Sequence, residues 1–207
     1  MLRKLWLFIM VVMLSAALAG AAQAKTLVVY FSMPETDKAE NMTEAEEDST
    51  IVVGGKVLGN VQYFAQVIQN ATGADIFRIE PKTPYTTNHR ELVDLARLEQ
   101  RRNARPELKS SVDGLGQYDT VFLGYPTWWA DLPMVLYTFL ETNDLSGKTV
   151  IPFNVHGGSG FAGTPRTIAK IQPNAKVLRN GLSIDRDRMD GSEAAILRWL
   201  GELGYAK

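Results

Sequence analysis

The chain has 207 residues, with 22 basic and 23 acidic side chains, two histidines and no cysteine. The nearly balanced charge and the lack of a basic stripe argue against a nucleic-acid-binding protein. Without cysteine, disulfides, thiolate metal sites and thiol redox chemistry are excluded, and with two histidines we expect no metal site. Any redox chemistry would have to come from a bound organic cofactor.

Residues 1–24 are predicted to be an export signal peptide. Arg3 and Lys4 precede an apolar run, and Ala22-Gln23-Ala24 has the small residues of a cleavage site. The alternative is an uncleaved anchor, but the run is short for a membrane span of roughly 20 residues. We expect cleavage after Ala24, a periplasmic or secreted mature chain, and no membrane attachment after cleavage.

The rest of the chain alternates between strand-like and helix-like segments. Residues 26–31 are almost wholly apolar, as in a strand buried on both faces. Residues 60–70 place apolar side chains at helical spacing. The expected strands are 26–31, 76–79, 121–123, 149–155 and 176–178, and the expected helices are 60–70, 89–102, 134–140, one within 161–171, and one capped by Ser192. This alternation predicts a single α/β domain over residues 25–207, with a five-stranded parallel sheet and helices on both faces.

An acidic insertion, at about residues 33–58, interrupts this alternation between the first strand and the first helix. Between residues 35 and 48, seven side chains are acidic and Lys38 alone is basic. One interpretation is a solvated loop. The other is a lid or a docking surface that attracts a basic redox partner through its field.

Two adjacent tryptophans, Trp128 and Trp129, follow the predicted strand 121–123. Ligands of open α/β sheets bind at the carboxyl ends of the strands. Paired indoles there suggest a flat aromatic ligand held by stacking. The alternative is that both indoles pack into the core or into a homodimer interface.

Four motifs together resemble the flavodoxin-like family, in particular a short bacterial branch with a Trp-Trp loop and a His-Gly-Gly-Ser-Gly loop. The motifs are Tyr30-Phe31-Ser32, Gly59-Asn60, the stretch from Tyr125 to Trp129, and the stretch from His156 to Gly160. The resemblance spans essentially all of the mature chain. It implies the sheet order 2-1-3-4-5, with FMN at the carboxyl ends of the first and third strands.

The resemblance also implies a role for each loop. The residues expected at the phosphate, where amides at a helix start favour an anion, are Ser32, Gly59, Asn60 and Val61. The residues expected beside the isoalloxazine ring are Pro126, Thr127, Trp128 and Trp129. The residues expected at the pyrimidine edge are His156, Gly157, Gly158, Ser159 and Gly160. His156 is also a candidate proton donor. The sequence departs from the family pattern at Val61, where a hydroxyl residue is usual, and in the insertion.

We therefore expect an exported FMN-binding redox protein that passes electrons to a partner protein or a small-molecule acceptor. One alternative is an FMN-dependent NAD(P)H or quinone reductase, although no dinucleotide-binding motif is recognisable. Another is a non-redox binding protein that kept the fold and lost FMN. Val61 and the exported location favour this last alternative, and the two loop motifs count against it.

Overall fold

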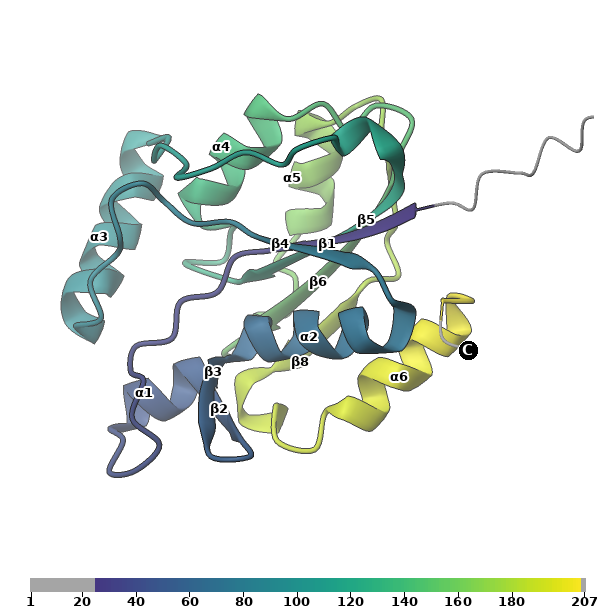
Figure 1. Cartoon of the computed structure of the whole chain (residues 1–207). Helices are drawn as coiled ribbons and strands as arrows, with labels where there is room; N and C mark the ends of the chain where they lie inside the picture. Colours follow the sequence, from purple (N-terminus) through teal and green to yellow (C-terminus); the bar gives the residue numbers. More distant parts are fainter. Residues whose placement is uncertain (1–24, 206–207) are drawn as a thin grey trace, which may run out of the picture.

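The computed structural model describes residues 25–205, so the predicted signal peptide lies outside the described residues. A parallel sheet stands between two layers of helices (Figure 1). The strands are β1 (Lys25–Tyr30), β4 (Asp75–Arg78), β5 (Tyr118–Pro126), β6 (Thr149–His156), β7 (Lys176–Val177) and β8 (Leu182–Asp185). Their order is β4-β1-β5-β6-β7, with β8 also paired to β6. The α/β class and the strand order are confirmed, but the sheet has six strands where five were predicted.

The sixth strand arises because the last position in the sheet is divided in two. β7 pairs with the start of β6, and β8 pairs with its end. Between them, Gly181 passes so close to β6 that a Cβ atom there would lie 2.0 Å from the carbonyl oxygen of Pro152. Pro152 has no N–H to donate to a neighbouring strand. The ladder is therefore interrupted at this point and resumes at Leu182.

The helices cover both faces of the sheet, as predicted. They are α2 (Asn60–Thr72), α3 (His89–Arg102), α4 (Met134–Thr142), α5 (Thr164–Ile171) and α6 (Glu193–Glu202). α2 and α6 lie side by side on one face, and α3, α4 and α5 lie on the other (Figure 1). Ser192 occupies the N-cap position of α6, as predicted, but its hydroxyl does not form the hydrogen bond to the helix backbone that a capping serine usually makes. None of the helices within residues 25–205 is long and apolar enough to cross a membrane.

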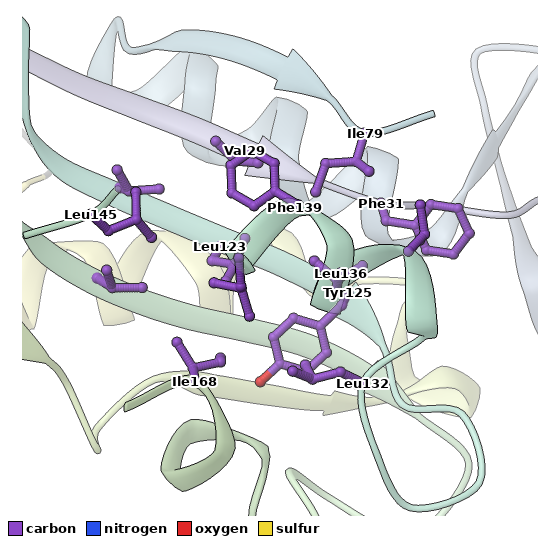
Figure 2. Close-up of a cluster of buried hydrophobic side chains, with 14 of the residues drawn as sticks. Val29, Phe31, Ile79, Leu123, Tyr125, Leu132, Leu136, Phe139, Leu145 and Ile168 are labelled. Atoms are coloured by element: carbon purple, nitrogen blue, oxygen red, sulfur yellow. The ribbon is translucent and has the colours of Figure 1, made fainter. Parts of the chain in front are cut away.

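Each face of the sheet contributes to a separate hydrophobic cluster, because successive strand residues point to opposite sides. Val29, Leu123 and Tyr125 belong to the cluster under α4 and α5 (Figure 2). Val28 and Phe122 belong to the cluster under α2 and α6. This two-sided burial explains why the strands read as continuous apolar runs, and it fixes the positions of the loops at the carboxyl ends of β1, β5 and β6.

The acidic insertion is folded, which the sequence analysis did not predict. It contains the short helix α1 (Glu44–Ser49) and the antiparallel hairpin β2 (Thr50–Val53) and β3 (Lys56–Gly59). Thr43 and Glu46 form a reciprocal capping box that starts α1. The hairpin turns at Gly54 and Gly55, which both have positive φ, as a two-residue type I′ turn requires. The hairpin leads directly into α2, because β3 ends at Gly59 and α2 begins at Asn60.

Candidate functional site

A pocket of about 510 Å³ lies at the carboxyl ends of β1, β5 and β6. This volume is within the range typical of small-molecule sites. Its wall is formed by the loops after these strands, the insertion, the start of α2, helix α3, and Arg186 after β8. The lining residues are Ser32, Met33, Glu35, Ala45, Asp48, Ser49, Asn60, Val61, His89, Leu92, Val93, Ala96, Pro126, Thr127, Trp128, Trp129, Val155, His156, Gly157 and Arg186. The structure therefore brings together nine of the residues predicted from the sequence.

Trp128 is held in one orientation by aromatic neighbours. Its ring packs edge-to-face on Phe31, at 5.4 Å between centroids, and on Tyr85, at 5.6 Å. Its backbone N–H and carbonyl both bond to Asp131 at 3.0 Å. Tyr85 is buried and donates its hydroxyl hydrogen to Glu99. The indole of Trp128 is thus a fixed, partly buried wall of the pocket.

Trp129 has a different environment, with 42% of its surface exposed. Its indole N–H donates to the carbonyl of Val93, at 3.1 Å, and the guanidinium of Arg97 lies 4.4 Å from the ring centroid. The backbone is left-handed here, with φ of 50°, and Gln100 donates to its carbonyl oxygen. Contacts with α3 therefore hold this indole at the mouth of the pocket, and Arg97 occupies one face of it.

The glycine-rich loop after β6 is folded back on His156. The N–H of Gly158 donates to His156 Nδ1 at 2.9 Å. Since Nδ1 accepts this hydrogen bond, the neutral imidazole carries its proton on Nε2 and can donate from there. Asp185 Oδ2 lies 3.6 Å from the same Nδ1. His156 and Gly157 line the pocket, whereas Gly158, Ser159 and Gly160 do not.

The loops after β5 and β6 are joined through the carbonyl of Gly160. It accepts hydrogen bonds from Thr127 Oγ1, at 3.2 Å, and from Asn154 Nδ2, at 2.9 Å. Gly158 and Gly160 both have positive φ, a conformation that glycine adopts without strain, so these two glycines are needed to form the turn. Of this loop's predicted residues, three therefore shape the site rather than line it.

In another part of the pocket wall, Ser32 meets the start of α2. Gly59 is the N-cap of α2, and a Cβ atom there would lie only 2.2 Å from Ser32 Oγ. Ser32, Asn60 and Val61 line the pocket, but Gly59 does not. The contact explains the need for glycine at position 59: it lets the start of α2 lie directly against Ser32.

The insertion adds two carboxylates to the pocket wall, neither of which was predicted as a site residue. Glu35 accepts a hydrogen bond from His89 Nδ1 at 3.0 Å. Asp48 forms an ion pair with Arg186 at 2.8 Å. Burial raises the pKa of Asp48, and the nearby Arg186 guanidinium opposes this shift. No motif marks these four residues, because they come from three separate segments, the insertion, α3 and the turn after β8, that only the fold brings together.

The sequence model of the flavodoxin family, described as "Flavodoxin", matches residues 49–202, so the chain belongs to this family. It is similar to the structure of a candidate flavoprotein of Bacteroides eggerthii, with 29% identity and a TM-score of 0.62 over 87% of this chain and 98% of that one. A second candidate flavoprotein, of Bacteroides uniformis, is 25% identical with a TM-score of 0.59 over 81% of this chain and 96% of that one.

A flavoprotein of Lactobacillus acidophilus, solved in complex with FMN, shares the fold. It is 17% identical, with a TM-score of 0.53 over 81% of this chain and 97% of that one. Among curated proteins, no sequence matches this chain. The resemblance to flavodoxin-like proteins that the motifs indicated is confirmed.

Proposed function

We propose that this chain is an exported redox protein that binds FMN and transfers electrons through it. The observation that carries the proposal is the pocket itself. It places an aromatic wall, a glycine-bearing loop and a helix start around one cavity at the carboxyl ends of β1, β5 and β6. Membership of the flavodoxin family and the fold shared with an FMN complex support the same conclusion.

The residues present suit FMN in kind. Trp128 and Trp129 offer aromatic surface for a flat ring, and Gly157 lines the pocket with the Arg186 guanidinium packed where a Cβ would stand. In another part of the wall, the N-terminus of the 13-residue helix α2 directs backbone amides at an anion, and Ser32 adds a hydroxyl. Val61 supplies no hydroxyl, so phosphate binding would depend on these amides and on Ser32.

A bound flavin supplies reversible uptake of electrons, which no side chain of this cysteine-free protein provides. The chain's own residues bind and orient it. Trp128, fixed by Phe31 and Tyr85, excludes water from one side of the pocket. His156 presents a donor from Nε2 and can hold a proton near the pyrimidine edge.

We further propose that the protein acts as an electron carrier for a partner protein. Helix α1 exposes Glu44 and Glu47 beside the pocket wall formed by Ala45 and Asp48. Carboxylates at the edge of a redox site steer a basic partner toward it, chiefly by raising the association rate. Export rests on the signal-like residues 1–24.

Flavin titration of the purified protein tests the proposal. FMN should quench tryptophan fluorescence and shift the flavin absorbance bands. Trp128→Leu and Trp129→Ala remove aromatic surface, and loss of the stacking indole should weaken binding by roughly 1–3 kcal/mol, by analogy with aromatic–base stacking. Trp199→Phe is the matched control, since Trp199 packs between α6 and the opposite face of the sheet. If neither pocket variant changes FMN affinity, the ring does not bind at this loop.

A further inference from the structure

Among the described residues, the wall of the pocket contains two carboxylates and one guanidinium group. Among the described residues that line it, the charged side chains are Glu35, Asp48 and Arg186, and the imidazoles are His89 and His156. Asp48 and Arg186 pair at 2.8 Å, so their charges cancel. Glu35 has no guanidinium or ammonium partner among the residues that line the pocket, and its neighbour there is the His89 imidazole, with Nδ1 at 3.0 Å. Its side chain is 8% exposed, against 52% for His89, so solvent screens the carboxylate poorly.

The pocket wall also contains a buried acceptor without a donor. Asn60, the first residue of α2, is 4% exposed. Its Nδ2 donates to the carbonyl of Asp48 at 2.9 Å, which fixes the orientation of the amide. Its Oδ1 has no hydrogen-bond partner within residues 25–205. A phosphate dianion offers only acceptors, so it cannot satisfy this atom.

The insertion also occupies part of the helix start that would otherwise attract an anion. The last turn of α1 meets the first turn of α2 through the Asp48–Asn60 hydrogen bond. The N–H of Gly59 is already bonded to Gln62 Oε1, at 3.3 Å. The carbonyl of Asp48 therefore lies at the first residue of α2, and its negative dipole end reduces the positive potential left for a phosphate.

We propose that this pocket binds riboflavin, the flavin without a phosphate, at least as tightly as FMN at neutral pH. The ring end is the same for both ligands. At the phosphate end of the ligand, repulsion between Glu35 and the phosphate offsets the attraction of the α2 amides, and a terminal hydroxyl carries no charge for Glu35 to repel. This inference deepens the proposed function and rests on it.

Competing titrations of riboflavin and FMN into the purified protein at pH 7.5 test this preference, with flavin fluorescence as the measurement. The dissociation constant for FMN should equal or exceed that for riboflavin. Glu35→Gln keeps an acceptor for His89 but removes the charge, so it should tighten FMN binding roughly tenfold and change riboflavin binding less than twofold. His89→Lys, which places a permanent cation against Glu35, should act in the same direction.

Glu44→Gln is the matched control, because it removes one charge from the insertion at an exposed residue outside the pocket lining. It should change neither constant more than twofold. The inference is overturned, with the proposed function intact, if FMN binds more tightly than riboflavin in the unmodified protein, or if neither Glu35→Gln nor His89→Lys changes the ratio of the two constants. If neither flavin binds, the proposed function fails as well.

Discussion

Replacing Gly59 by alanine tests whether Ser32 and the start of α2 form one unit. Gly59 has φ of −68° and ψ of 145°, a conformation that alanine adopts without strain. Its methyl group would lie 2.2 Å from Ser32 Oγ and 3.1 Å from Pro34 Cδ, so the Ser32 side chain must rotate or the loop after β1 must shift. Overpacking lowers the free energy of unfolding by about 1–3 kcal/mol. Alanine also reduces the conformational entropy of the unfolded chain, which raises the free energy of unfolding by about 0.4–1 kcal/mol. We expect a net loss of about 1–2 kcal/mol in the free energy of unfolding.

Two other glycines provide controls for this substitution. Gly201→Ala, in helix α6 with open space around it, should stabilise the protein by up to about 1 kcal/mol. Gly124→Ala places a methyl group 2.1 Å from the ring of Phe153, outside the pocket lining, and should destabilise the protein without changing flavin affinity. Urea unfolding and flavin titration measure the two effects. If Gly59→Ala is as stable as the parent protein and binds flavin equally well, the proposed contact between Ser32 and α2 does not shape the site.

Three further predictions concern other parts of the chain. Mass spectrometry of the exported protein should find Lys25 at the N-terminus, and a chain beginning at Met1 would contradict cleavage. Burial raises the pKa of Glu99 in the folded state, so the stability that its protonated form contributes should be lost as the pH rises through this raised pKa. Glutamine stays uncharged, so the denaturant midpoint of Glu99→Gln minus that of the parent protein should be larger at pH 7 than at pH 4. Neutralising Glu44 and Glu47 together should slow electron transfer to a basic partner at low salt, and an unchanged, salt-independent rate would leave α1 without a docking role.

The fold was predictable wherever burial imposes a regular pattern. Residues 26–31 and 149–155 are apolar on both faces, and both form parallel strands of the sheet. The division of the last strand was harder to predict. It depends on Pro152 in β6 and on the close approach of Gly181, and these two residues are brought together only by the pairing of β6 with β7 and β8.

The insertion shows that local signals were present in the sequence but did not stand out. Thr43 and Glu46 have the spacing of a capping box, and Gly54-Gly55 lies between two short apolar segments, as in a type I′ hairpin. The density of acidic residues instead favoured a solvated loop. Local patterns could not predict that Glu35 and Asp48 line the pocket, because the partners of these carboxylates lie far away in the sequence, on α3 and after β8.

The match to the flavodoxin family begins at residue 49, within the insertion, and leaves β1 and Ser32 outside it. The structure nevertheless places Ser32 in contact with Gly59, because the β2–β3 hairpin returns the chain to the end of β1 before α2 begins. The helix start that faces the pocket is therefore assembled from two separated segments, with α1 packed against it. Changes in the insertion can alter the charge at this end of the pocket while Trp128 and the loop after β6 stay fixed by their own contacts. That separation is the physical basis for expecting ring binding and phosphate preference to respond to different substitutions.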